Sequence, residues 1–150
     1  MRIEICTPAM AEDWLSLRPL LWPHPLAEHR LEVERALANP DAIAFLARDE
    51  DGAAIGFAEA TLRHDYVNGC ITSPVGFLEG IFVAENHRRR GVARALCQAV
   101  ETWVIGRDCS ELASDSWLDD VRSQRMHGAL GFSETERVVY FRKLLKPTRA

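Results

Sequence analysis

Apolar residues in the first half of the chain fall in patterns that predict strands. Arg2–Cys6 alternates as a half-buried strand does. The apolar runs Ala42–Arg48 and Ala54–Arg63 flank the polar loop Asp49–Gly52, an arrangement typical of a hairpin. Val75–Val83 is a third apolar run of strand length. Together these segments predict an antiparallel sheet.

Four segments predict helices, and in Gly91–Ile105 the apolar residues recur at helical spacing. We expect helices over about Pro8–Arg18, Leu26–Ala38, Gly91–Ile105 and about Asp119–Leu130. Pro19 should break the first helix because proline lacks an amide donor and its ring clashes with the preceding turn. Gly131 should cap the last one.

The run Val75–Val83 carries a charge and two glycines among its apolar residues. Five side chains should share one face of this strand: Val75, Phe77, Glu79, Ile81 and Val83. Gly76 and Gly80 would lie on the other face. A glycine inside a strand often marks a bulge, so we expect one near Gly80.

Three shorter segments complete the predicted sheet. Glu111–Ser114 predicts a short strand, and Ser133–Glu136 and Arg137–Leu145 predict two closing strands. The fold class is therefore α/β (α+β), with a mixed and mostly antiparallel central sheet of about seven strands flanked by about four helices. The length of 150 residues fits a single domain spanning residues 1–150.

Composition and charge exclude several function classes. The net charge of −4 argues against nucleic acid as a partner, because duplex binding needs a basic face. The four cysteines form no CxxC pair and have no metal-ligand spacing, so no metal site is expected. The chain has neither a signal-peptide pattern nor an apolar run long enough to span a bilayer, which favours a cytoplasmic location and no membrane partner.

The segment Arg88–Ala93 is the strongest candidate for a ligand site. It lies between a predicted strand and the most amphipathic predicted helix, whose first amides would be unpaired and could bind an anion. Gly91 lets the backbone approach a phosphate, and Arg94 adds charge to the arginine run. A solvated surface run is the alternative. The motifs of P-loops and dinucleotide folds are absent.

The pattern Arg88-x-x-Gly91-x-Ala93 after a strand resembles the coenzyme A signature of the GNAT N-acetyltransferase superfamily, and the order of elements is similar throughout the chain. Four further blocks resemble the aminoglycoside 6'-N-acetyltransferases, bacterial enzymes that inactivate aminoglycoside antibiotics. These blocks are Arg63–Gly69, Phe77–Val83, Ala113–Asp115 and Ala129–Arg137.

This resemblance implies an acetyl-CoA-dependent enzyme that needs no metal and is a homodimer. The amine of the aminoglycoside would attack the thioester directly within a ternary complex. The implied coenzyme contacts are Ile81, Phe82 and Val83 for the acetyl carbonyl, and Arg88, Arg89, Arg90, Gly91, Val92, Ala93, Arg94 and Asp120 for the rest of the molecule.

An aminoglycoside carries several ammonium groups, so its pocket should be acidic. Glu79, Asp115 and Glu136 fit this requirement, and Glu79 is the expected base for the ammonium proton. The alternatives are an ion pair with an arginine for Glu79, helix capping for Asp115 and an exposed strand end for Glu136. Trp22 and Tyr66 could wall the sugar site or serve in ordinary packing.

The chain departs from the superfamily pattern in the last predicted helix. Many members have an asparagine and a tyrosine where this sequence has Asp120 and His127. The tyrosine usually protonates the leaving thiolate. His127 could take over that task, since imidazole titrates near neutrality, although a packing role is the alternative.

Other functions remain open from the sequence. An acetyltransferase for another small amine, a polyamine or a protein N-terminus would share the coenzyme site and differ in its acceptor pocket. A non-catalytic acyl-CoA sensor would bind the coenzyme without turnover.

Overall fold

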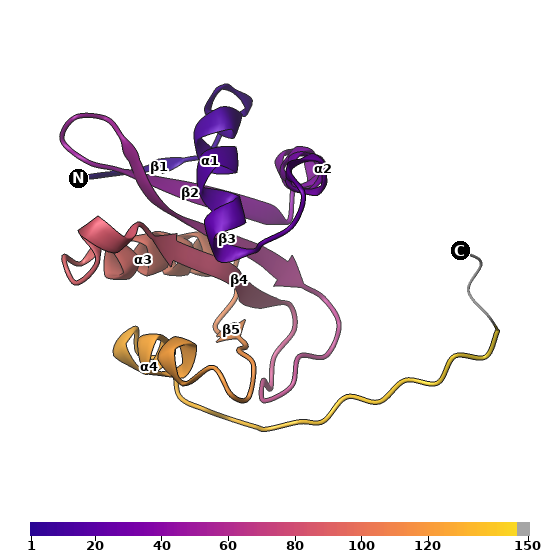
Figure 1. Cartoon of the computed structure of the whole chain (residues 1–150). Coiled ribbons are helices and arrows are strands. Elements are labelled where there is room, and N and C mark those ends of the chain that lie inside the picture. Colours follow the sequence, from indigo (N-terminus) through magenta and orange to yellow (C-terminus); the bar gives the residue numbers. More distant parts are fainter. Residues whose placement is uncertain (147–150) are drawn as a thin grey trace.

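A computed structural model describes residues 1–146 and contains one five-stranded sheet (Figure 1). The strands are β1 (Arg2–Ile5), β2 (Ala42–Arg48), β3 (Ala54–Arg63), β4 (Val75–Val83) and β5 (Leu112–Ser114), and they lie in this order across the sheet. The first four pair antiparallel, and β5 pairs parallel with β4. The expected mixed, mostly antiparallel sheet is confirmed.

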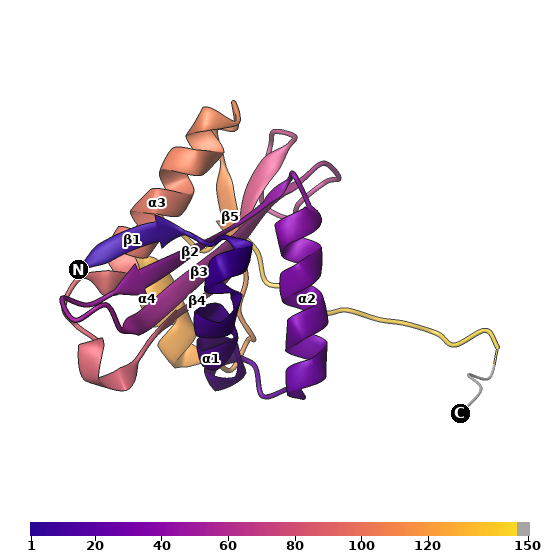
Figure 2. The same ribbon diagram turned by 90° about the horizontal axis from the view of Figure 1, so that it is seen from above.

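Helices cover both faces of the sheet. They are α1 (Ala11–Leu21), α2 (Leu26–Ala38), α3 (Val92–Gly106) and α4 (Val121–Ala129), with short 3-10 turns at Pro8–Met10 and Glu85–His87. Helices α1 and α2 lie on one face and α3 on the other (Figures 1 and 2), and α4 packs through Met126 against the core on the α3 side. This layering brings the start of α3 close to the end of β4.

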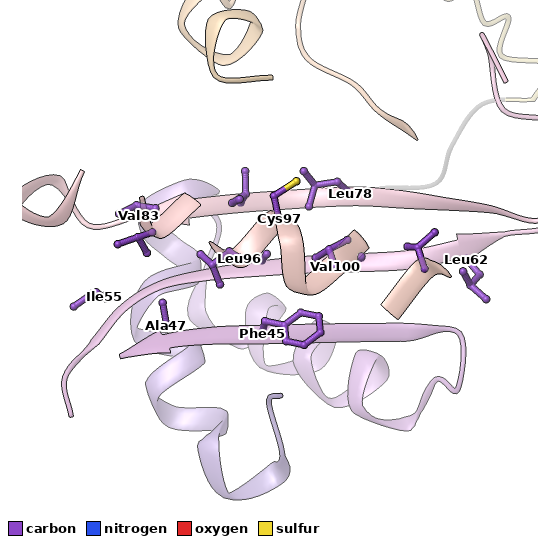
Figure 3. Close-up of a cluster of buried hydrophobic side chains, with 14 of the residues drawn as sticks. Phe45, Ala47, Ile55, Leu62, Leu78, Val83, Leu96, Cys97 and Val100 are labelled. Atoms are coloured by element: carbon purple, nitrogen blue, oxygen red, sulfur yellow. The ribbon is translucent and has the colours of Figure 1, made fainter. Parts of the chain in front are cut away.

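The main core lies between α3 and the sheet (Figure 3). Leu96 and Val100 of α3 are fully buried there against strand residues such as Phe45 and Leu78. A second cluster, which includes Trp14, Val33 and Phe57, packs α1 and α2 against the opposite face. The two cores fix α1, β4 and α3 relative to one another.

The prediction that Pro19 would break the first helix is wrong. Helix α1 continues through Pro19 to Leu21. The proline lies in the last turn, where it removes one intrahelical hydrogen bond and only two residues follow it. Packing of the apolar face of α1 on the sheet outweighs that loss. By contrast, the predicted bounds of α2, β2, β3 and β4 match the structure.

The expected bulge is present in β4, and it overturns the predicted face of that strand. Glu59 of β3 pairs with Gly80, and the next residue, Ala60, pairs with Leu78, so Glu79 is the extra residue. An extra residue reverses the alternation of side chains beyond it. Ile81 and Val83 therefore pack in the α3 core, whereas Val75 and Phe77 form a separate cluster with Val67.

The two closing strands predicted at 133–136 and 137–145 are absent from the described residues. Residues 133–146 instead form an extended arm that leaves the body after α4 (Figures 1 and 2). The arm contains no glycine, proline, asparagine or aspartate, and its one serine, Ser133, stands at its start, so residues 134–146 lack the residues that favour tight turns. It cannot readily fold into a hairpin on itself, which accounts for five strands where about seven were expected.

Candidate active site

The turn before α3 is built to receive an anion. Gly91 has a left-handed φ of 80° at the N-cap of α3, and a Cβ added there would meet no atom within 4 Å. No side chain of residues 1–146 caps this helix end. The first helical hydrogen bond runs from the Ala95 amide to the Gly91 carbonyl. The amides before it point into open space at the positive end of the helix dipole.

The four arginines of the turn have different surroundings. Arg88 donates from Nε to the Val83 carbonyl at 2.9 Å, and Arg94 donates to the Ala129 carbonyl at 3.3 Å. Arg89 and Arg90 are exposed, and Arg89 has a left-handed φ of 61°. That conformation costs a non-glycine residue about 1 kcal/mol. Two exposed cationic side chains thus lie beside the open amides, an arrangement that favours an anion.

Strands β4 and β5 separate at the bulge, and this split lies next to the turn. Their pairing ends at Leu78 opposite Ser114. Glu79 and Asp115 are the next residues along the two strands, so both carboxylates lie at the mouth of the split. Beyond it, Ile81, Phe82 and Val83 keep only β3 as a strand partner. A bound acyl group could therefore approach the unpaired edge of β4.

Glu79 is already engaged by its own chain. Both carboxylate oxygens accept hydrogen bonds at 3.0 Å from Nη2 of Arg63, and Oε1 also accepts one from the Thr61 hydroxyl at 2.7 Å. The Arg63 guanidinium also stacks over the ring of Phe77, 3.4 Å from its centroid. Pairing with an arginine, the alternative open at the sequence level, is thus the arrangement present here.

Residues 8–132 match the sequence model of the acetyltransferase (GNAT) family. The chain belongs to this family. An aminoglycoside N(6')-acetyltransferase type 1 of Serratia marcescens is 53% identical over 144 residues, which cover 95% of this chain and 99% of that one. Another of the same name from Stenotrophomonas maltophilia is 50% identical over 147 residues, covering 97% and 95%.

Solved structures agree with this relationship. Apo aminoglycoside 6'-N-acetyltransferase AAC(6')-IG of Acinetobacter haemolyticus superposes with a TM-score of 0.94 at 47% identity and covers 97% of this chain and all of its own. AAC(6')-Iy in complex with the bisubstrate analogue CoA-S-monomethyl-acetylneamine has a TM-score of 0.90 at 46% identity, with coverage of 96% and 99%. This chain is thus an acetyl-CoA-dependent acetyltransferase with the GNAT fold.

Trp22 of this acetyltransferase lies half-buried over the bulge. Its ring occupies the space that a side chain at Gly80 would need, and it meets Phe57 edge-on with centroids 6.0 Å apart. The Arg18 guanidinium lies 4.9 Å from its ring centroid on the inner side. Trp22 therefore borders the split from the α1 face of the sheet.

A buried polar network that sequence reasoning missed supports Trp22. Arg18 donates to both carboxylate oxygens of Glu59, at 2.7 and 2.8 Å, and to Glu32 at 2.6 Å. His29 is fully buried between Arg18 and the Trp22 carbonyl. Burial alone would lower the pKa of Arg18, but its hydrogen bonds to the two glutamates outweigh that effect and raise the pKa. The sequence did carry a signal for this network, because a charged residue stands among apolar ones in each element, Arg18 in α1 and Glu59 in β3.

Tyr66 and Glu136 lie on the loop side of the sheet. The Tyr66 side chain is 73% exposed in the loop after β3. The arm crosses this loop where Thr135 packs on Gly69, and Glu136 follows immediately. Asp115 and Glu136 are exposed and form no hydrogen bond or ion pair with any residue described. Their carboxylates are available to a cationic ligand.

Asp120 and His127 are both held by neighbours. Asp120 caps α4 by accepting from the Ser123 amide at 3.0 Å, which leaves Asp115 without the capping role that was its alternative. His127 sits between the Ser123 carbonyl and the hydroxyl of Ser114, at 2.7 and 2.8 Å. Ser114 is a second residue that the sequence analysis missed, since a serine ending a strand carries no motif.

Residues 1–146 show no sign of a metal centre or of a membrane-spanning helix. They contain no group of three or more potential metal ligands. None of their helices combines the length and apolar character that crossing a membrane requires.

Proposed function

We propose that this protein transfers the acetyl group of acetyl-CoA to the 6'-amine of aminoglycoside antibiotics and so confers resistance to them. The observation that carries the proposal is the roughly 50% identity, over nearly the whole length of both chains, to enzymes named for this activity. We further propose that the whole chain forms one acetyltransferase domain and acts in the cytoplasm.

The donor side of the proposal rests on the turn before α3. The pyrophosphate of acetyl-CoA would accept hydrogen bonds from the open amides around Gly91, with Arg89 and Arg90 supplying positive charge. The thioester would then extend into the split between β4 and β5. Backbone amides of Ile81 to Val83 that lack a β5 partner would polarise its carbonyl.

The acceptor side rests on Glu79 and Asp115 at the mouth of the split and on Glu136 of the arm. Asp115 and Glu136 carry no counter-charge from the described residues, so ammonium groups of an aminoglycoside can pair with them. Glu79 is bound by Arg63, and we propose that it orients the substrate amine together with Trp22 and Tyr66. Direct attack on the thioester then follows once the amine has lost its proton.

Thiol release from acetyl-CoA tests this function directly. Aminoglycosides with a 6'-amine, such as kanamycin and tobramycin, should release thiol, and analogues with a 6'-hydroxyl should not. Preferred release with polyamines or peptide N-termini would establish the alternative substrate class. Coenzyme binding without turnover for any amine would instead establish a sensor.

Two substitutions separate the donor and acceptor sides. Gly91→Glu places a carboxylate beside the proposed pyrophosphate and should abolish coenzyme binding measured by calorimetry. Asp115→Asn should raise the KM for the aminoglycoside about tenfold, because it removes the charge pair with a substrate ammonium group; a tenfold change corresponds to about 1.4 kcal/mol. Asp119→Asn, in the same exposed loop, is the matched control. An unchanged KM in Asp115→Asn would reject the acidic pocket.

We also propose that the enzyme is a homodimer joined through the arm. The arm exposes Val139, Tyr140, Phe141 and Leu145, each more than 70% accessible. Large apolar side chains in such number mark a contact surface. An extended chain whose backbone groups lack a partner also favours addition to the edge of another sheet.

The edge at β5 is the matching surface. Leu112–Ser114 presents no charge along its free edge, whereas the other edge strand, β1, carries Arg2 and Glu4. Trp117, just after β5, is 81% exposed, and Ile71 in the adjoining loop is 94% exposed. The arm of a partner bound at this edge would cover these side chains and lie beside the mouth of the split.

Light scattering after size exclusion tests the dimer. The wild type should have twice the mass of the chain, and Val139→Asp combined with Phe141→Asp should yield monomers. Leu20→Asp, at an exposed leucine of α1, should stay dimeric. A monomeric wild type at micromolar concentration would contradict the proposal.

A further inference from the structure

A chain of hydrogen bonds runs from α4 into the split between β4 and β5. His127 Nδ1 lies 2.7 Å from the Ser123 carbonyl, and Nε2 lies 2.8 Å from the Ser114 hydroxyl. That hydroxyl is also 3.1 Å from the Leu78 carbonyl. Leu78 and Ser114 are the last paired residues of the two strands, so the chain ends where the strands part.

Donor and acceptor chemistry determines the positions of the protons. A carbonyl only accepts, so the 2.7 Å contact with the Ser123 carbonyl places a proton on Nδ1 of His127; the Ser123 hydroxyl is a second and longer contact of Nδ1, at 3.4 Å. When the imidazole is neutral, Nε2 accepts the proton of the Ser114 hydroxyl. When it is protonated, Nε2 donates to Ser114, and Ser114 donates to Leu78. The serine proton therefore switches between two acceptors as His127 gains or loses its own.

Both imidazole nitrogens are occupied, so the ring itself presents no proton to the split. The Ser114 hydroxyl is the outermost donor of the chain, on the side of Leu78. The ring is also fixed in place, because Phe132 meets it edge-on at 5.3 Å and the Phe132 amide bonds to the His127 carbonyl at 3.0 Å. The serine is held equally firmly by the β5 backbone. In this geometry the Ser114 hydroxyl needs only to turn from the Leu78 carbonyl toward the sulfur, while the serine and the imidazole ring keep their places.

We propose that Ser114 donates its hydroxyl proton to the leaving thiolate of coenzyme A, and that His127 replaces this proton on the serine oxygen. The inference rests on the proposed acetyl transfer. As the amine nitrogen bonds to the carbonyl carbon, the C–S bond breaks and its electron pair stays on sulfur. The Ser114 proton passes to sulfur while the proton on Nε2 of His127 passes to the serine oxygen. The amine releases one proton to water, and His127 regains one from water.

Four variants test the relay: Ser114→Ala, Ser114→Thr, His127→Gln and the double Ser114→Ala/His127→Gln. Ser114→Ala should lower kcat about a hundredfold, within the range of general acid catalysis, with the KM values of both substrates unchanged. Ser114→Thr keeps the hydroxyl and should restore most of kcat. Because the two residues act as one unit, the double variant should be no slower than Ser114→Ala alone. Ser110→Ala, an exposed serine before β5, is the control.

Two results would overturn the relay. One is a Ser114→Ala enzyme with wild-type kcat, and the other is a double variant whose loss equals the product of the single losses. Melting temperatures of all variants separate a loss of fold from a loss of chemistry. A wild type that acetylates no aminoglycoside would refute the proposed function alone, since kcat ratios on any amine that it does accept still test Ser114.

Discussion

Replacing Glu59 with glutamine exchanges one carboxylate oxygen for an amide nitrogen and should strongly destabilise this protein. Glu59 accepts from Trp14 Nε1 at 3.1 Å and from two nitrogens of Arg18 at 2.7 and 2.8 Å. The two side chains of the ion pair are only 11% and 5% exposed. Glu59→Gln leaves the buried guanidinium facing an amide, and one amide hydrogen points at a donor.

The magnitude follows from burial. Removing one partner of a buried ion pair costs about 3–5 kcal/mol. Glu32 remains paired with Arg18, but its side chain is 48% exposed and compensates only weakly. We therefore expect a loss near the lower end, about 3 kcal/mol. For a chain of this length that loss corresponds to a fall in Tm of about 6–12 °C.

Urea unfolding followed by tryptophan fluorescence, together with a thermal melt, measures this loss. The matched control is Glu12→Gln, which breaks the Arg30 pair whose side chains are 78% and 45% exposed, and its Tm should not change. Arg18→Met with Glu59→Leu removes both charges and should recover much of the stability. A Glu59→Gln protein that melts with the Glu12→Gln control would refute the reasoning.

Three further predictions concern backbone strain, thiol reactivity and acid stability. Gly91→Ala should destabilise the protein by about 1–2 kcal/mol through its left-handed φ and raise the KM for acetyl-CoA, whereas Gly106→Ala, also in open space but at ordinary φ, should do neither. In the native protein at pH 8, mass spectrometry should find Cys70 alkylated by iodoacetamide before Cys6, because burial raises the pKa of the Cys6 thiol to about 12. A hydrogen bond from the Arg18 guanidinium lowers the pKa of Glu32 below its ordinary value of 4.5. The ionised Glu32 therefore stabilises the fold fully above pH 4.5, and this stabilisation is lost as the pH falls through the lowered pKa of the folded state. Glu32→Gln should accordingly show a shallower loss of Tm below pH 4.5.

The sequence by itself determined the local elements and the anion turn. The bounds of α2, β2, β3 and β4 followed from apolar segments and from the proline, glycine and polar residues that flank them, because these signals act within a few consecutive residues. The pattern around Gly91 likewise predicted a glycine turn at a helix start, since that property resides in a few consecutive residues.

Only the tertiary structure decided how distant residues meet. Gly80 marked the bulge in β4 locally, but the register with β3 decides that Glu79 is the extra residue and that the faces of the strand reverse beyond it. Arg18 and Glu59 are 41 residues apart in the chain and neutralise each other only once α1 packs on the sheet. The arm after Phe132 contains the apolar run Val138–Phe141, as a strand would, but a strand needs a neighbour, and the described part of this chain provides none for it. Contacts between residues distant in the sequence, rather than local preference, therefore determined where the sheet ends and which residues lie at the mouth of the split.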